Sequence, residues 1–288
     1  MPKYTSFKDS ENIKRKNNSI NFSTDTPIIM GIINLSPDSF YDGGVYSNNE
    51  KIITQTKKML DEGAAIIDIG GQSSRPGAKQ IDPKKELSIV LPAIKLLKNR
   101  FPNIMISIDT FWSEVAKECV NKGANIINDI SAGEIDKNMF NIVSELQVPY
   151  IMMHMQGRPK NMQNNPHYKN IIQEIQNFFN KKISELQNKG FNNIIIDPGI
   201  GFGKSITHNY KLINNIQSLK ELGFPVLIGA SRKSMIYNVL NIEAQEALNG
   251  TTVINTLALE NGANILRVHD VKEAIECVKI IKFAKNNQ

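Results

Sequence analysis

The chain has 288 residues, of which 41% are hydrophobic, and a formal net charge of +6. Its excess of Lys is scattered rather than clustered, so we expect no nucleic-acid partner and at most a preference for small anionic molecules. No apolar run reaches about 18 residues and no signal-peptide core is present, which argues against a membrane span and favours a soluble, cytoplasmic protein. Cys119 and Cys277 lack metal-site spacing and favour a reducing compartment and packing roles.

The N-terminal stretch differs in composition from the rest of the chain. Residues 1–26 are rich in Lys, Asn, Ser and Asp and hold little that could be buried. This composition is typical of a short, flexible and poorly ordered extension. We therefore expect one domain over residues 27–288, with one large core.

Eight short apolar runs recur along that domain, and segments with helical spacing lie between them. The runs cover residues 28–33, 65–69, 104–108, 125–127, 150–153, 194–196, 226–228 and 265–266. Strands alternating with helices eight times predict an α/β fold of the closed (β/α)8 TIM-barrel type, which usually takes about 250 residues. Active sites of such barrels lie where the strands end.

The segments between the runs have the apolar stripes of helices that cover a barrel. In the last one, Val271, Ala274 and Val278 lie on one face, and charged side chains lie on the other. Asp270 is expected to cap this helix, with Glu273 as its capping-box partner. Similar stripes near Ile52 and Ile171 predict further helices.

Polar side chains follow several of the predicted strands. Asp109, Asn128 and Asp197 each come at a strand end. Singly, Asp109 and Asp197 are better explained as turn formers or helix caps. On one barrel face all three residues can together pair with a flat heterocycle that offers adjacent donors and acceptors, and we favour an aminopyrimidinone edge.

The glycine-rich segment 199–205 resembles a phosphate-binding loop but has the wrong spacing, because only three residues separate Gly199 from the Gly-Lys-Ser triplet. Its glycines are better explained by tight turns and close backbone approach to a ligand, with Phe202 as an aromatic wall. For Lys204, a solvent-exposed position is the better expectation.

Basic side chains follow the seventh and eighth strands. Residues 231–234 read Ser-Arg-Lys-Ser, and Arg267 and His269 lie two residues apart. Barrels of this type commonly hold phosphate there, where each charge-assisted bond contributes roughly 1.5–3 kcal/mol. Together these residues suggest an anionic leaving group.

The first two strands lead into loops rich in Gly, Pro and hydroxyl groups, over residues 34–44 and 70–77. Such loops often close over a site. At the start of the first loop, Asn34 offers an uncharged oxygen suited to Mg²⁺ that is held mainly by substrate phosphates and water.

Five motifs, at residues 30–40, 70–78, 197–204, 229–234 and 267–270, closely resemble those of dihydropteroate synthase, a folate-pathway family of the pterin-binding barrel superfamily. The resemblance runs from about residue 27 to 286 in the family's motif order. It implies a Mg²⁺-assisted condensation of a dihydropterin-methyl diphosphate with 4-aminobenzoate, giving dihydropteroate and diphosphate. It also implies a homodimer. The helix residues Val253, Leu257 and Leu259 offer apolar area for such a contact, but each is better explained by packing against the barrel.

The resemblance also implies roles for individual residues. The pterin would be bound by Asp109, Asn128, Asp197 and Lys233, with Ile130 and Met153 against its ring. The diphosphate would be bound by Asn34, Ser74, Arg267 and His269, with Asn34 also serving the metal. The aminobenzoate would be bordered by Phe40, Pro76, Phe202 and Ser234. Catalysis would rest on Lys233, Arg267, His269, Asp38 and Arg75, with Asp38 and Asp197 supplying a negative field around a cationic pterin.

This chain departs from the family pattern at three loop positions. Gln72 stands where the family usually has Glu, and Ser36 and Ser74 stand where it usually has Thr. The serines keep a hydroxyl, whereas Gln72 removes a charge and could alter loop closure or sulfonamide discrimination. Two alternatives to the synthase are a methyltetrahydrofolate-dependent corrinoid methyltransferase and a non-catalytic pterin-binding paralogue. The first has no need of a diphosphate site, and the second should show a gap in the catalytic residues that we do not find.

Overall fold

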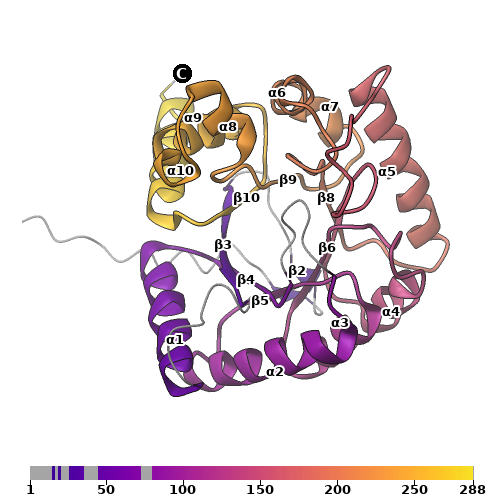
Figure 1. Cartoon of the computed structure of the whole chain (residues 1–288), viewed down its shortest axis with the longest axis vertical. Helices are drawn as coiled ribbons and strands as arrows, with labels where there is room; N and C mark the ends of the chain where they lie inside the picture. The colour runs from indigo at the N-terminus through magenta and orange to yellow at the C-terminus, as the bar shows by residue number, and fades with distance from the viewer. Residues whose placement is uncertain (1–14, 17–18, 21–25, 36–44, 73–79, 288) are drawn as a thin grey trace, which may run out of the picture.

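The computed structural model describes residues 15–16, 19–20, 26–35, 45–72 and 80–287. Within it, a ring of parallel strands is surrounded by helices (Figure 1). The strands of the ring are β3 Ile28–Asn34, β4 Ile66–Gly70, β5 Ile106–Asp109, β6 Ile126–Asp129, β7 Tyr150–Met153, β8 Ile194–Asp197, β9 Leu227–Ile228 and β10 Ile265–Val268. The helices are α1 Val45–Glu62, α2 Pro83–Arg100, α3 Ser113–Asn121, α4 Met139–Leu146, α5 Ile171–Gln187, α6 Ile206–Asn214, α7 Ile216–Lys220, α8 Ser234–Leu240, α9 Leu248–Glu260 and α10 Val271–Lys285, with a 3-10 turn at Ala244–Glu246.

The strands pair in parallel in the order β8-β7-β6-β5-β4-β3-β10-β9. A parallel bridge between Ile196 and Val226 joins the two ends of this sheet. There the N–H of Ile196 donates to the carbonyl of Pro225 at 2.9 Å. The TIM barrel predicted from the eight apolar runs is confirmed, and each run coincides with a strand to within two residues at either end.

A short antiparallel pair lies ahead of the barrel, in the N-terminal extension. It joins β1 Arg15–Lys16 to β2 Ser19–Ile20. The rest of residues 1–25 lies outside the described residues, so the predicted flexible extension stays a prediction.

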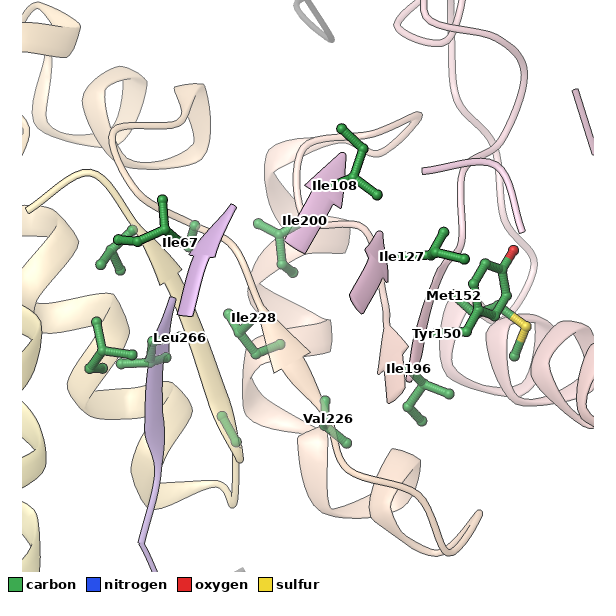
Figure 2. Close-up of a cluster of buried hydrophobic side chains, with 14 of the residues drawn as sticks. Ile67, Ile108, Ile127, Tyr150, Met152, Ile196, Ile200, Val226, Ile228 and Leu266 are labelled. Carbon is green, nitrogen blue, oxygen red and sulfur yellow. The ribbon is translucent and has the colours of Figure 1, made fainter. Parts of the chain in front are cut away.

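The alternation of side chains along each strand builds two apolar layers, because successive residues point to opposite faces. The outer layer packs against the helices, and Figure 2 shows some of its members, among them Ile67, Ile127 and Leu266. The inner layer fills the barrel with side chains from all eight strand segments: Met30, Ile66, Met105, Ile126, Ile151, Ile195, Leu227 and Ile265.

Two residues further along, the same inward face becomes polar on several strands. Asp68, Asn128, Asp197 and Arg267 each stand two positions after a member of the inner apolar layer. Because the strands are parallel, their carboxyl ends lie at one end of the barrel. The fold therefore brings these polar groups together above an apolar core.

The last helix has the buried face that its sequence predicts, but its N-terminus is not capped as expected. Val271, Ala274 and Val278 of α10 are buried, as the apolar stripe predicted. Asp270 is the N-cap residue of α10, but its side chain makes no cap bond, so the predicted capping box with Glu273 is wrong. Its carboxylate instead accepts from Nε and Nη2 of Arg232 at 2.8 and 2.9 Å. Two charge-assisted bonds to a planar guanidinium outweigh one bond to a backbone N–H.

Both cysteines pack as predicted. Cys119 in α3 and Cys277 in α10 are free, buried thiols. Burial raises the pKa of each thiol, which keeps both in the unreactive protonated form. Among the described residues, none of the helices has the length and apolar character needed to cross a membrane.

Candidate active site

A guanidinium hydrogen-bonded to two carboxylates lies at the centre of the polar end of the barrel. Nε of Arg267, from β10, donates to Oδ2 of Asp68 at 2.6 Å, and its Nη2 donates to Oδ2 of Asp109 at 2.6 Å. Oδ2 of Asp68 also accepts from Nδ2 of Asn128 at 3.1 Å. Four strands thus contribute to one network, which contains three of the residues predicted from the sequence.

Asp68 is the member of this network that sequence reasoning missed. It lies inside the apolar run 65–69, whose composition predicts a core strand. In the structure it is fully buried and faces the barrel interior. A signal was present, because Asp68 is the one charged residue in that run, and buried carboxylates are rare unless they are paired.

Asp109 lies at the rim of the same network and has an unusual pKa. Burial raises the pKa of Asp109 to about 7, with the positive charge of Arg267 opposing the rise and the negative charges of Asp68, Asp129 and Asp197 adding to it. A ligand N–H bonded to this carboxylate would favour its charged form. Asp109 is therefore a group whose proton is easily displaced near neutral pH.

Asp197 and Lys233 form a second pair of opposite charges in the same mouth. Oδ1 of Asp197 accepts from the N–H of Gly199 at 2.7 Å, and burial raises its pKa while Lys233 opposes the rise. Nζ of Lys233 donates to the carbonyl of Ile200 at 2.6 Å and lies 4.7 Å from the centre of the Phe202 ring. Burial lowers the pKa of Lys233 to about 8, and the charge of Asp197 opposes this.

Apolar side chains line the space beside these charges. Phe111, Ile130, Met153, Met162 and Phe202 form one buried cluster. The two side chains predicted to pack on the pterin, Ile130 and Met153, therefore lie in one group with the predicted aromatic wall. Such a surface suits the faces of a flat ring, while the polar groups suit its edge.

The glycine-rich turn after β8 is tight, as predicted. Gly199, Gly201 and Gly203 have φ values of 71°, 82° and 59°, which other residues rarely adopt. A Cβ on Gly199 would lie 2.0 Å from the carbonyl oxygen of His154. The backbone at Gly199 thus lies close to the loop after β7, whereas the sequence predicted a close approach to a ligand.

Lys204 is not at the surface, so the expectation of a solvent-exposed lysine is wrong. Lys204 is only 3% exposed. Its Nζ lies 3.0 Å from Nδ1 of His154 and donates to the carbonyl of Phe202 at 2.9 Å. These acceptors come from the lysine's own turn and from the loop after β7, and the second contact cannot be read from local spacing.

His269 lies at the mouth as a neutral ring. Its Nδ1 lies 3.0 Å from Oγ of Ser231, which follows β9. Desolvation by the surrounding protein, and next the positive charge of Arg267, lower the pKa of His269 to about 4. In the tautomer whose Nδ1 accepts from the serine hydroxyl, Nε2–H is left to donate to an anion.

Asn34 ends β3 at the same mouth and is exposed. A Cβ on its register partner Gly70 would lie 3.7 Å from Oδ1 of Asn34 and 3.5 Å from Cβ of Asp109. These are ordinary van der Waals distances, so Asn34 and Asp109 both lie beside Gly70 at the mouth. Within the described ranges, no group of three or more His, Cys, Asp and Glu could hold a metal ion. An ion beside Asn34 would need oxygens from substrate and water.

Ser234 begins α8 directly after Lys233, which is the N-cap residue of that helix. The remaining predicted site residues, Asp38, Phe40, Ser74, Arg75 and Pro76, lie outside the described residues.

Comparisons with known proteins agree with this geometry. A family model described as pterin binding enzyme matches residues 30–269. A dihydropteroate synthase from Haemophilus influenzae is 42% identical over 262 residues, covering 90% of this chain and 94% of that protein. The chain belongs to the dihydropteroate synthase family.

Solved dihydropteroate synthases also share the fold. The Yersinia pestis enzyme, in a sulfonamide drug complex, superposes with a TM-score of 0.86 at 38% identity, covering 92% of this chain and 96% of that one. The Xanthomonas albilineans dihydropteroate synthase with 4-aminobenzoic acid gives a TM-score of 0.84 at 36% identity, covering 91% of this chain and 94% of that one. Membership of the dihydropteroate synthase family favours the synthase over the corrinoid methyltransferase alternative.

Proposed function

We propose that this protein is a dihydropteroate synthase, a transferase that condenses (7,8-dihydropterin-6-yl)methyl diphosphate with 4-aminobenzoate to give 7,8-dihydropteroate and diphosphate in folate biosynthesis. The observation that carries the proposal is the convergence of Asp109, Asn128 and Asp197 with Arg267 and Lys233 in one barrel mouth, in a chain of this family.

The acidic side of the mouth suits the pterin. Oδ2 of Asp109 is bonded to Arg267, which leaves its other oxygen for ring N–H groups. Asn128 and Asp197 extend this edge, and Lys233 can donate to a ring acceptor. The rings then stack over Ile130 and Met153. This division of polar edge and apolar face is what a fused heterocycle requires.

The basic side of the mouth suits the diphosphate. Arg267 carries several N–H donors, and His269 offers Nε2–H beside it. Asn34 would hold Mg²⁺ together with diphosphate and water oxygens, and this ion would reduce the negative charge on the leaving group when bound. Ser74 would add a hydroxyl to the same diphosphate.

The reaction needs charge stabilisation and orientation more than a strong base. The C–O bond to diphosphate breaks and its electron pair leaves on oxygen, while the arylamine nitrogen forms the new C–N bond and loses a proton. Arg267 and His269 stabilise the departing oxygens, and Asp197 and Asp38 stabilise positive charge on the pterin. Phe202 and Ser234 would orient the aminobenzoate together with Phe40 and Pro76, and Arg75 would bind the substrates.

The test is to mix the purified protein with the pterin diphosphate, 4-aminobenzoate and Mg²⁺, and to look for dihydropteroate by mass spectrometry. We expect dihydropteroate and an equal amount of diphosphate, and a sulfonamide should lower the yield of dihydropteroate. A parallel assay with methyltetrahydrofolate and a corrinoid should give no methyl transfer. Methyl transfer without condensation would reverse the assignment.

We also propose that the protein works as a homodimer in the cytoplasm. Several apolar side chains on α8, α9 and α10 are exposed, among them Val253 at 52% and Phe283 at 73%, and these helices lie together in Figure 1. Leu257 is also exposed, so the expectation of core packing is wrong for Val253 and Leu257, whereas Leu259 is buried in the core as expected. Free buried thiols suit a reducing compartment. Sedimentation should give a dimer that Val253→Glu weakens, and a monomer at high concentration would contradict this.

A further inference from the structure

Asp68 links the two halves of the proposed site from below. Its Oδ2 accepts from Nε of Arg267, on the diphosphate side, and from Nδ2 of Asn128, on the pterin side. The two donors lie at 2.6 and 3.1 Å from this one oxygen. A single carboxylate therefore fixes the distance between a cation and an amide that would hold different parts of the same substrate.

The depth of Asp68 separates it from the groups that reach substrate. Its side chain is 0% exposed, whereas the side chain of Asp109 is 12% exposed. In the sheet register, Gly70 lies opposite Asp109, and Asp68 lies opposite Ser107, two residues deeper. Asp68 is thus below the layer in which Asp109 lies.

The floor around Asp68 is polar and incompletely paired. Oδ1 of Asp68 and Oγ of Ser107 are both buried, and neither has a hydrogen-bond partner among the described residues. A buried carboxylate retained at such a position costs free energy unless it is compensated. Its compensation here is the bond to Arg267, so the two residues stabilise each other.

We propose that Asp68 is a positioning residue on which Arg267 pivots, an inference that rests on the proposed function. The Nη2 bond to Asp109 is the one at the rim, so it is the bond that substrate can exchange. When the pterin engages Asp109, the Nε bond to Asp68 keeps the guanidinium in place, and Nη2 turns to the diphosphate. Asp68 also holds the amide of Asn128 toward the pterin edge.

The test compares Asp68→Asn with Ser107→Ala, a matched change in the neighbouring strand at the same depth. Asn keeps the size and one acceptor but removes the charge that holds Arg267. We expect Asp68→Asn to lower kcat and the affinity for inorganic diphosphate by about 10- to 100-fold, with the KM for 4-aminobenzoate nearly unchanged. Ser107→Ala should leave all three values near those of the wild type. Should Asp68→Asn fail to fold, Asp68→Ser, which leaves room for a water, replaces it.

A double-mutant cycle separates positioning from a general loss of structure. In an Arg267→Lys background, the guanidinium fork is already lost, so Asp68→Asn should cost much less than in the wild type. Equal costs in both backgrounds would overturn the proposal, as would kinetics of Asp68→Asn that match Ser107→Ala. Wild-type turnover is measured first, because its absence refutes the synthase itself. The diphosphate affinities then still report whether Asp68 acts through Arg267.

Discussion

Nζ of Lys204 lies 3.0 Å from Nδ1 of His154 and also donates to the carbonyls of His154 and Phe202, at 3.3 and 2.9 Å. Three acceptors match the three N–H donors of a lysine ammonium. Burial lowers the pKa of Lys204 to about 7, with the charge of Asp197 opposing this. The lysine thus joins the loop after β7 to the turn after β8 and holds Phe202 at the edge of the site.

Replacing Lys204 by Met should loosen that turn. The change leaves three buried acceptors without a donor, so we expect a loss of about 1–3 kcal/mol in the free energy of unfolding. Because Phe202 moves with the turn, the KM for 4-aminobenzoate should rise more than the KM for the pterin diphosphate. Urea unfolding and steady-state kinetics measure both effects. Lys211→Met, on the exposed face of α6, is the control and should change neither. An equal rise in both KM values would contradict the link to Phe202.

A buried carboxyl behind the site predicts a pH-dependent stability. Glu86, in the first turn of α2, is fully buried and accepts from Oγ1 of Thr110 at 3.2 Å. Burial, and next the negative charge of Asp109, raise its pKa from 4.5 to about 8. Between these two values the folded protein binds a proton that the unfolded chain does not, so stability contributed by Glu86 is lost as pH rises through this window.

Glu86→Gln should remove that loss. The neutral side chain keeps an acceptor for Thr110, so its free energy of unfolding should resemble that of the wild type near about pH 5 and exceed it increasingly toward about pH 9. Urea unfolding over this range gives the difference directly. A constant difference at all pH values would show that the carboxyl of Glu86 titrates normally.

The strands and their polar ends could be predicted from the sequence because both are local patterns. Apolar runs of strand length mark the barrel, and Asp109, Asn128 and Asp197 follow such runs directly. Partners across the barrel leave no comparable pattern. Whether Asp270 caps its own helix or binds Arg232 depends on a residue 38 positions away in the chain.

The role of Asp68 in the polar network and the burial of Lys204 could not be predicted, for the same reason. Asp68 is paired with a residue 199 positions distant, and Lys204 with one 50 positions distant. Local composition identifies each only as a charged residue. Asp68 lies within a strand, and Lys204 lies within a glycine-rich turn. Only the closed ring of strands brings in the group that makes burial of the charge possible.

Gln72 gives a third prediction, at a position where the sequence motif suggests a departure from the family pattern. Its Oε1 accepts from the N–H of Ile81 at 2.8 Å, and the carbonyl of Ile81 accepts from Nε1 of Trp112 at 3.1 Å. Gln72→Glu keeps this acceptor and adds a negative charge at the base of the second loop. We expect unchanged stability and altered affinities for sulfonamide and 4-aminobenzoate, measured by calorimetry.

Gln72→Leu is the matched variant, because it removes the bond to Ile81 without adding charge. If the charge matters, the two variants should differ in sulfonamide affinity. Unaltered kinetics and unaltered sulfonamide binding in Gln72→Glu would show that this position has no influence on the site.

Arg267 gives the strongest prediction for turnover. Arg267→Ala leaves the carboxylates of Asp68 and Asp109 facing each other without a cation, which should cost about 3–5 kcal/mol of stability and favour protonation of Asp109. Loss of the donor to the departing diphosphate should lower kcat by about 100-fold or more. Urea unfolding measures the loss of stability, and the rate of dihydropteroate formation measures the loss of turnover.

We expect that a positive charge alone cannot replace the guanidinium of Arg267, and Arg267→Lys tests this. Lys keeps the positive charge but cannot bond Asp68 and a second oxygen with one planar fork, so it should restore most of the stability and little of the turnover. Added guanidinium should partly restore turnover to Arg267→Ala and have no such effect on Arg267→Lys, where the space is filled. Arg100→Ala, at the exposed end of α2, is the control for a general loss of positive charge. If Arg267→Ala kept wild-type turnover and diphosphate affinity, the leaving group would have to be bound elsewhere in the mouth.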